Sequence, residues 1–252
     1  MNIIVPFKVV PDDQDIAVAP DGRLDCSKAK PVVSTYDLNA IEAAVQLADA
    51  HEGSKVVAIS VGPSSIDDSK LKKNVLARGV DELAMTADDA LENLDSFATA
   101  AELEKLIASI GAWDIIICGD GSADLYAQQV DVQLAARLNV AQVSGAIRIE
   151  IRDDAVIVER LLEKETETVM APLPAVVSVS PDIALPRICG MKDILAAGKK
   201  PANVVPANDA SVPVVEIASE KAPEQTDRKL VLLDAADDSA IEQFAAALKA
   251  SL

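Results

Sequence analysis

The stretch I-I-I-C-G-D-G-S-A-D-L-Y-A-Q-Q-V, residues 115–130, decides the fold of this chain. An apolar run typical of a buried strand leads into two glycines, and the residues after them have the pattern of a helix. Gly119 and Gly121 permit a tight turn and a close backbone approach to a ligand, and Ser122 or Asp124 is expected to cap the helix. Because the unpaired N–H groups of a helix start favour anionic oxygens, the stretch predicts a nucleotide site.

The same glycines do not match the two common phosphate-binding patterns. The stretch contains neither G-x-G-x-x-G nor G-x-x-x-x-G-K-[ST], so it predicts neither a Rossmann dinucleotide site nor a P-loop. An ordinary strand-to-helix turn is the alternative interpretation of this segment taken alone. The choice between the two depends on the rest of the chain.

Strand and helix patterns alternate through the first half of the sequence. Hydrophobic residues make up 50% of the chain but aromatic residues only 2%, so the core is built mainly from Ala, Val, Ile and Leu, which suits a parallel sheet covered by helices. The alternation predicts an α/β fold with right-handed crossovers. Strands are expected at residues 2–7, 55–61, 82–86 and 114–118, and helices from an N-cap at Asp37, at 66–78 and at 94–110.

The second half of the sequence predicts a β-rich extension of the same domain, followed by an arm. Short strands are expected at residues 146–151, 156–162, 166–170 and 175–180, and a short helix at 191–197. Earlier in the chain, residues 10–15 read as a loop and 16–25 as a hairpin. From Lys199 the chain reads as a connector with few apolar residues, so we expect a nucleotide-binding α/β domain at 1–200 and a C-terminal arm at 201–252.

The arm ends in a predicted amphipathic helix. Ser239 and Glu242 form a capping-box pattern, and Ile241, Phe244 and Leu248 share one helical face with Ala245 between them. This apolar face must be buried either on its own domain or on a partner subunit. We favour the partner, because docking of a helix in a groove is a standard use of such a segment.

Charge and cysteine content exclude several classes of function. The net charge of −18 disfavours binding to nucleic acid or to an anionic membrane, and no apolar run is long enough to insert in a bilayer. The three cysteines, Cys26, Cys118 and Cys189, are far apart in sequence. We expect them to act as small hydrophobic residues with free thiols, as is usual for proteins of a reducing compartment. We therefore expect a soluble cytoplasmic protein.

The sequence contains no recognisable set of catalytic or metal-binding residues. His51, the single histidine, follows a predicted helix and is expected to face solvent or the helix C-terminus. Paired aspartates recur in predicted loops and helix starts, where turns and caps explain them better than a metal ion. The charged residues between 159 and 167 are expected to line an antiparallel strand pair. We therefore assign no catalytic residue and no metal ligand.

Taken with residues 115–130, a second segment indicates a family. Residues 158–178, V-E-R-L-L-E-K-E-T-E-T-V-M-A-P-L-P-A-V-V-S, resemble the signature stretch of the beta subunit of electron transfer flavoproteins, with Lys164 as one departure. Residues 11–18, 35–44 and 191–201 are similar to the FixA-like branch of that family. The resemblance extends over most of the chain.

This resemblance implies an adenine nucleotide alpha-hydrolase-like fold, a member of the HUP or Rossmann-like group, and a heterodimer with an alpha subunit that carries FAD. The beta subunit would hold AMP, or a second FAD in members that bifurcate the electron pair of NADH. Redox partners would be an acyl-CoA dehydrogenase or a protein of the ferredoxin or flavodoxin type. The cofactor-binding residues implied here lie at strand ends and helix starts: Pro6, Ser34, Thr35, Tyr36, Asp37, Val61, Gly119, Asp120, Gly121, Ser122, Ala123, Asp124, Leu125, Tyr126, Ala127, Gln128, Gln129 and Val130.

Asp120 departs from the family pattern, since many relatives carry a basic residue there. A phosphate would then depend on the backbone of residues 121–124, on Ser122, Gln128 and Gln129, and on the helix start. The alternative function is an AMP- or ATP-binding stress or signalling module of the same fold. That module shares the glycine turn but leaves residues 158–178 and the terminal arm unexplained.

Overall fold

The computed structural model describes residues 1–224, 230–234 and 236–251 of the chain. Two compact units make up the chain. The larger unit contains Met1–Ala17 and Asp25–Ser219, and the smaller one contains Val18–Leu24 and Glu220–Leu252. Every residue of the implied cofactor site belongs to the larger unit.

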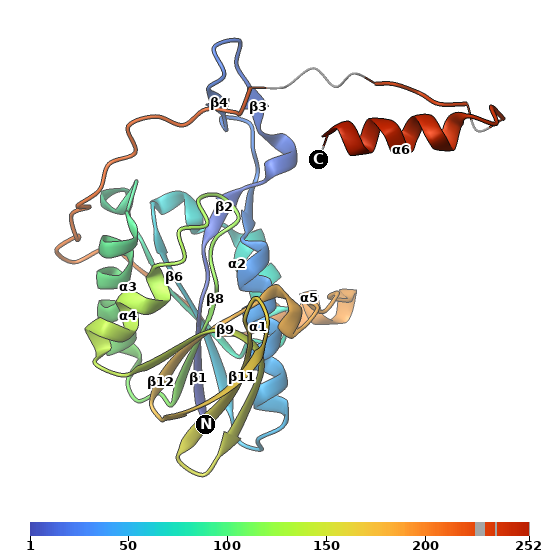
Figure 1. Ribbon diagram of the computed structural model, residues 1–252. Coiled ribbons are helices and arrows are strands. Elements are labelled where there is room, and N and C mark those ends of the chain that lie inside the picture. The colour runs from blue at the N-terminus through green and yellow to red at the C-terminus, as the bar shows by residue number, and fades with distance from the viewer. Residues whose placement is uncertain (225–229, 235, 252) are drawn as a thin grey trace. The chain divides into compact units, whose positions relative to one another are not determined.

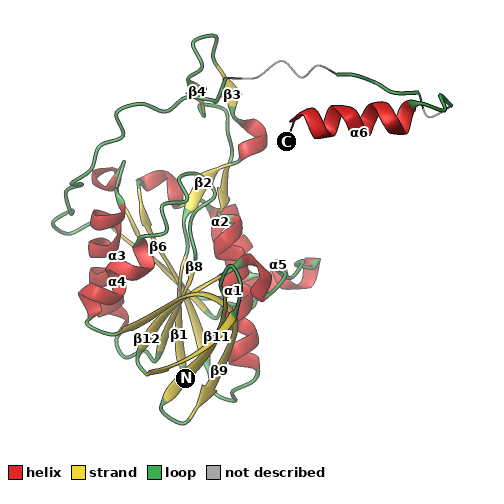
Figure 2. Cartoon of the chain, in the orientation of Figure 1, coloured by secondary structure: helices red, strands yellow, loops and turns green. Residues whose placement is uncertain are grey.

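A nine-stranded sheet forms the centre of the larger unit, in the order β11-β10-β9-β12-β8-β1-β6-β7-β13. Neighbouring strands from β9 to β13 along this order are parallel, and the β9-β10 and β10-β11 pairs are antiparallel (Figure 2). The predicted α/β class with a β-rich extension is therefore confirmed. The strands are β1 (Asn2–Pro6), β6 (Lys55–Gly62), β7 (Glu82–Ala87), β8 (Ile115–Gly119), β9 (Ala141–Arg152), β10 (Ala155–Leu161), β11 (Thr166–Pro172), β12 (Ala175–Val179) and β13 (Ala202–Val205).

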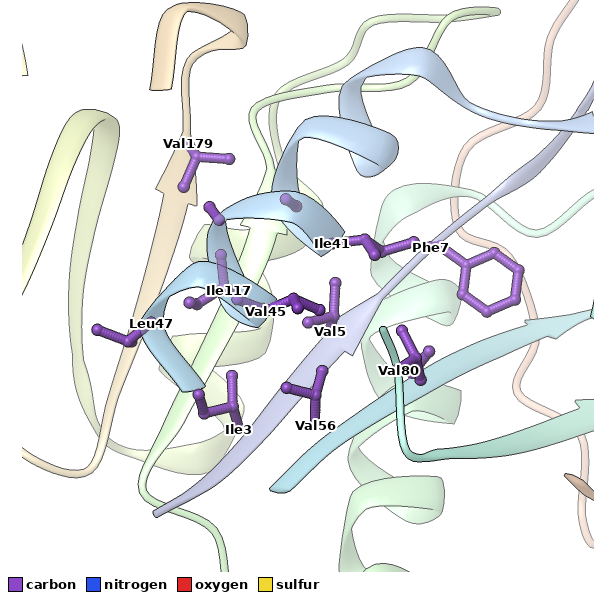
Figure 3. Packing of buried hydrophobic residues seen from close by; sticks show 14 of the residues in the cluster. Ile3, Val5, Phe7, Ile41, Val45, Leu47, Val56, Val80, Ile117 and Val179 are labelled. Carbon is purple, nitrogen blue, oxygen red and sulfur yellow. The ribbon is translucent and has the colours of Figure 1, made fainter. Parts of the chain in front are cut away.

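The central strands are buried on both faces. Alternate residues of β1 enter two different core clusters: Ile3 and Val5 belong to one, and Ile4 belongs to the other. Strand β8 divides in the same way, with Ile117 in the first cluster and Ile116 in the second. Figure 3 shows the first cluster, in which the side chains of β1 and β8 pack against the helix that follows β5. Because side chains alternate between faces along a strand, apolar residues at consecutive positions require cover on both sides.

Helices supply this cover in two layers. Residues of α1 and α2 pack in the first cluster, and residues of α3 and α4 in the second, on the opposite face of the sheet. Figure 1 shows the two pairs on either side of the strands, with α5 next to α1 and α2. The helices are α1 (Thr35–Asp49), α2 (Ser69–Leu76), α3 (Ser96–Ile110), α4 (Val130–Leu138) and α5 (Met191–Ala197).

Two helix starts differ from the sequence prediction. Asp37 is not the N-cap of α1: Ser34 holds that position, in an extended conformation, and Asp37 lies within the first turn. The helix expected from residue 66 begins only at Ser69, because residues 64–66 form a 3-10 turn and the Asp68 side chain accepts hydrogen bonds from the N–H groups of Lys70 and Leu71. Apolar spacing places a helix along the sequence, but the cap decides where it begins.

Two segments that read as loops contain strands. Residues 10–15 include part of β2 (Val9–Pro11), which pairs with β5 (Pro31–Val33), and a 3-10 turn at Asp13–Asp15. The predicted connector after Lys199 includes β13, which pairs with β7 at the edge of the sheet. Strands β2 and β13 are short and mostly not buried, so no alternation of apolar residues marks them in the sequence.

The charged strand pair is confirmed. Strands β10 and β11 form an antiparallel hairpin in which Arg160 is paired with Glu167, and the Arg160 Nε lies 3.1 Å from a Glu167 carboxylate oxygen. On the neighbouring strand β9, Arg148 contacts Glu159 at 3.2 Å. Opposite charges at facing positions stabilise such a hairpin.

The smaller unit contains the turn of a short hairpin and the last helix. Strands β3 (Ala17–Val18) and β4 (Leu24–Asp25) form the hairpin predicted for residues 16–25, and Arg23 makes an antiparallel bridge with Lys221. The predicted terminal helix is present as α6 (Ala240–Ser251), with Ile241, Phe244 and Leu248 exposed. Among the described residues, no helix has both the length and the apolar character needed to cross a membrane.

Three acidic side chains hold the segment after β13 against the sheet and α3. Asp88 accepts a hydrogen bond from Ala207 N at 3.2 Å, and the buried Glu102 accepts one from Ser211 N at 2.7 Å. Asp95, the N-cap of α3, also accepts bonds from Val214 N and Val215 N, both at 2.8 Å. Burial opposes the ionisation of Asp95 and Glu102, but hydrogen bonds outweigh it and lower the pKa of both carboxyl groups. The donors are Ala98, Val214 and Val215 for Asp95, and Lys105 and Ser211 for Glu102.

We expect acid to release residues 207–215 before the sheet unfolds. A lowered folded-state pKa means that the stabilisation is present above the ordinary carboxyl pKa and is lost as the pH falls through the lowered value. Amide hydrogen exchange of Ser211, Val214 and Val215 should therefore accelerate below about pH 4. Asp95→Asn should accelerate exchange at Val214 and Val215 at pH 7, whereas Glu216→Gln, at an exposed carboxylate, should not. Unchanged exchange in Asp95→Asn would contradict this role.

Candidate functional site

The candidate site lies at the carboxyl ends of three neighbouring parallel strands. Pro6 ends β1, Val61 lies next to the last residue of β6, and Gly119 ends β8. From β1 the chain moves to β6 and β7 on one side and then returns to β8 on the other side, so the direction of strand addition reverses at β1. Ligands of open α/β sheets bind at this kind of reversal, outside the carboxyl ends of the strands.

Gly119 allows the start of α1 to approach the end of β8. A Cβ atom at residue 119 would lie 2.7 Å from the Asp37 Oδ1 and 3.0 Å from the Tyr36 carbonyl carbon, closer than real side chains come. The N–H of Ala123 also donates to the Oγ of the fully buried Ser34, at 3.3 Å. These contacts join two predicted segments of the site, residues 34–37 and residues 119–124.

The segment after Gly119 is a series of turns, not a helix. Ser122 and Asp124 do not cap α4, which begins at Val130 with Gln129 as its N-cap. The backbone of Tyr126 has φ of 46° and that of Gln128 has φ of 54°, in the left-handed region that an α-helix cannot include. The Ser122 hydroxyl donates to the Asp124 carboxylate at 2.5 Å instead of accepting from a helix N–H. The predicted helix start is therefore wrong by several residues.

Both tyrosines of the chain lie in this site. The ring centroids of Tyr36 and Tyr126 are 4.9 Å apart with a tilt of 37°. The Tyr126 hydroxyl donates to the Asp120 carboxylate at 2.9 Å and accepts from the Gln128 amide at 3.4 Å. The sequence analysis did not predict the contact between these rings. The signal was available, because the chain has only two tyrosines and both fall in predicted segments of the site.

The ring of Tyr126 also explains Gly121. A Cβ atom at residue 121 would lie 2.4 Å from a carbon of that ring, so any side chain here displaces Tyr126. The second glycine of the turn thus accommodates the tyrosine directly. Any contribution of Gly121 to ligand binding depends on this packing.

A buried carboxyl group links α1 to the loop after β1. Asp37 is 6% exposed and accepts a hydrogen bond from the Lys8 N–H at 2.7 Å. Burial raises its pKa to about 7, although the hydrogen bond and the charge of Lys8 oppose the shift. This role explains why Asp37 lies inside the helix and does not cap it.

Lys8 is the cation of the site. Its Nζ forms an ion pair with Asp124 at 2.5 Å. Burial opposes ionisation of Asp124, but the hydrogen bonds from Lys8 and Ser122 outweigh burial and lower the pKa of this carboxyl group. Sequence reasoning passed over Lys8, although its place directly after a strand at a sheet edge is a recognisable signal.

Only one of the two carboxylate oxygens of Asp120 has a hydrogen-bond partner among the described residues. Its Oδ2 accepts from Tyr126, whereas its Oδ1 is buried and has no hydrogen-bond partner among the residues that the structure describes. Burial raises the pKa of this carboxyl group. The hydrogen bond from Tyr126 opposes this shift.

The model of the electron transfer flavoprotein domain family matches residues 24–210, well over half of the chain. The chain belongs to this family. The matched range contains the start of α1, the turns after β8, and the hairpin of β10 and β11. The electron transfer flavoprotein family is associated with flavin. Of the predicted site residues, all except Pro6 lie within the matched range.

Not every predicted site residue of this electron transfer flavoprotein domain faces the turn after β8. The side chains of Val61 and Val130 are partly buried and pack against the second core cluster. Leu125 and Ala127 are exposed on the turn itself. The structure brings together Ser34, Tyr36 and Asp37 with the residues from Gly119 to Asp124 and with Tyr126.

We expect Asp37→Asn to stabilise the domain at high pH. The folded-state pKa of about 7 lies above the ordinary value of 3.8, so the wild-type contribution falls as the pH rises between these values. The amide retains an acceptor for the Lys8 N–H and carries no charge. The free energy of unfolding of Asp37→Asn, measured relative to that of wild type, should rise by on the order of 1 to 3 kcal/mol between pH 4 and pH 8.

Urea unfolding at several pH values measures this difference. Asp49→Asn, which removes a carboxylate that is 71% exposed, is the matched control and should follow wild type. A constant difference between Asp37→Asn and wild type across the range would contradict the assignment of the shifted pKa to Asp37.

Proposed function

We propose that this chain is the beta subunit of a heterodimeric electron transfer flavoprotein of the FixA-like branch. In this role it carries electrons between dehydrogenases, or NADH, and acceptors, together with an alpha subunit that holds FAD. The family match supports the general class. The observation that carries the proposal is the close approach of Gly119 to Tyr36 and Asp37 at the strand reversal, because it builds one ligand site from segments far apart in sequence.

The residues at the turn after β8 suit an adenine nucleotide, either AMP or a second FAD. The Ser122 hydroxyl and the amides of Gln128 and Gln129 can donate to phosphate oxygens, as can the backbone at the start of α4. Lys8 would offset the charge of a phosphate, and the partly neutral Asp37, with a pKa of about 7, would limit repulsion. The unpaired Oδ1 of Asp120 offers an acceptor for a ligand hydroxyl or amino group. Flavin, when bound, supplies the redox chemistry, and the protein orients it.

The amphipathic helix α6 supports a partner subunit. We propose that residues 1–200 are the nucleotide-binding domain and that residues 201–252 are an arm whose helix docks on the alpha subunit. Ile241, Phe244 and Leu248 provide an apolar stripe at helical spacing. The arm and the hairpin of β10 and β11 favour this function over that of a stress or signalling module, which would need neither.

The electron donor and acceptor follow from the same proposal. An acyl-CoA dehydrogenase or a partner of the ferredoxin or flavodoxin type would exchange electrons with the heterodimer. If residues 119–130 hold FAD, the heterodimer would bifurcate the electron pair of NADH. We also propose a cytoplasmic location, in keeping with three cysteines that remain free thiols.

The nucleotide content of the heterodimer tests the proposal. The chain is co-expressed with its alpha subunit, and nucleotides released by acid are quantified by chromatography. One FAD and one AMP per heterodimer would indicate a simple electron carrier, and two FAD without AMP would indicate a bifurcating protein. Reduction of the second form by NADH would be the next measurement. A purified chain without nucleotide and without a stable partner would contradict the proposal.

We expect Gly121→Val to abolish nucleotide retention without unfolding the domain. The new side chain meets the Tyr126 ring and must move it, which changes the turn while the core strands stay intact. Nucleotide content and far-UV circular dichroism measure the two effects. Gly198→Val is the control, because a Cβ atom at residue 198 makes only ordinary contacts. Normal nucleotide content in folded Gly121→Val would exclude this site.

A further inference from the structure

A second cavity lies away from the turn after β8. It has a volume of about 540 Å³ and is bounded by the first turn of α1, by α2, by residues 186–189 and by α5. Figure 1 shows these three helices together on one side of the sheet. The volume is within the range of about 300 to 1,000 Å³ that is usual for sites of small molecules. The proposed nucleotide site uses none of the residues that line this cavity.

The charge of the cavity is opposite to that of the chain. Its lining includes Lys70, Lys73, Arg78 and Arg187, and none of the described residues that line it is acidic. The chain as a whole has 41 acidic and 23 basic residues, so four basic residues and no acidic one in a single lining are not expected from composition. Such a cluster attracts anions by a local positive potential.

The two arginines are held in place by the protein. Arg187 makes a bidentate contact with the buried Glu42, with Nε to Oε2 at 2.7 Å and Nη2 to Oε1 at 3.1 Å. Arg78 donates from Nη1 to the Arg187 carbonyl oxygen at 2.9 Å. These contacts connect α1, α2 and the loop before α5, so the wall of the cavity is fixed before any ligand arrives. A preorganised wall lowers the entropy cost of binding.

The two lysines have no such partner. Lys70 and Lys73 are exposed and lie three residues apart on one face of α2. Neither forms an ion pair with any residue in the described ranges, whereas the neighbouring Lys72 pairs with Asp67. Lysine ammonium groups suit a phosphate or carboxylate as mobile point charges. Unlike Arg187, whose charge is compensated by Glu42, they leave their charge available for a ligand.

Apart from Asn74 and Cys189, the rest of the lining is apolar. Leu38, Ala77, Pro186, Ile188 and Ile194 contribute to it. Ile188 is 98% exposed and Ile194 is 42% exposed, so a ligand that covers them removes apolar surface from water. An inorganic anion would leave this surface uncovered.

We propose that this cavity binds a small organic anion, a phosphate or carboxylate on an apolar body. The anionic group contacts Lys70 and Lys73 at the rim, and the apolar body lies against Leu38, Ile188 and Ile194. The proposal does not depend on the proposed nucleotide site, which lies at the strand ends and has a different lining.

Titration of the full-length chain with 1-naphthyl phosphate tests the proposal. 1-Naphthol lacks the anion and inorganic phosphate lacks the apolar body, so each should bind at least about tenfold more weakly. Lys70→Gln/Lys73→Gln should weaken the binding of 1-naphthyl phosphate by about tenfold or more. Lys28→Gln/Lys164→Gln removes two exposed lysines elsewhere and is the matched control for net charge; it should bind as wild type does.

Cys189 locates the bound probe. This partly buried thiol lines the cavity, whereas Cys118 is buried in the core and Cys26 is exposed. In a Cys26→Ser chain, saturating 1-naphthyl phosphate should slow the alkylation of Cys189 by iodoacetamide several-fold, and 1-naphthol at the same concentration should not.

Three results would overturn the proposal. Equal binding of 1-naphthol would show an apolar pocket without anion selectivity. Equal losses in the two double-lysine variants would show an effect of net charge alone. Unchanged alkylation of Cys189 at saturation would place the probe elsewhere. The outcome is distinguishable from failure of the proposed function, which is judged by the nucleotide content of the heterodimer.

Discussion

Burial of the central strands on both faces is the constraint on which the rest of this structure depends. Ile3, Ile4, Ile115 and Ile116 are at most 1% exposed, although neighbours in sequence point to opposite faces. Such strands are stable only in the middle of a sheet with helices on both sides. Strand β1 therefore has neighbours on both edges, and the chain reverses its direction of strand addition there. This reversal explains why the candidate site lies at the carboxyl ends of these strands, since the connections on either side of β1 leave in opposite directions there.

The candidate site shows how a polar site is built on an apolar scaffold. The end of β8 reaches the start of α1 only because residue 119 has no side chain. The same approach buries Asp37, whose carboxyl group then requires the Lys8 N–H as a partner and acquires a pKa of about 7. Burial thus makes Asp37, an acidic residue that would repel a nucleotide, partly neutral near physiological pH.

The first turn of α1 contributes to two separate places on the molecule. Asp37 faces the turn after β8, and the adjacent Leu38 lines the cationic cavity beside α2. Adjacent helical residues point about 100° apart, so one turn can serve two surfaces. The cavity in turn depends on the ion pair between Arg187 and Glu42, which ties the loop before α5 to α1. Both places are therefore built on the same helix and share its rigid packing against β1.

The sequence by itself determined the elements whose signals are local. The strands expected at 55–61, 82–86 and 175–180, and the helix at 191–197, agree with the structure to within one residue, because apolar periodicity and turn residues act over a few neighbours. Gly119 and Gly121 also marked the turn at the end of β8 correctly in the sequence.

Only the tertiary structure decided the features that depend on distant partners. Strand β13 exists because it pairs with β7, more than a hundred residues away, and nothing in its own sequence marks it. The contact of Tyr126 with Tyr36 accompanies the left-handed backbone that delays α4 to Val130. Asp37 became a buried acceptor, not a cap, because β1 brings Lys8 to it. The four cations of the cavity come from segments that meet only after folding. In each case the energy comes from contacts between residues far apart in sequence, which local pattern does not encode.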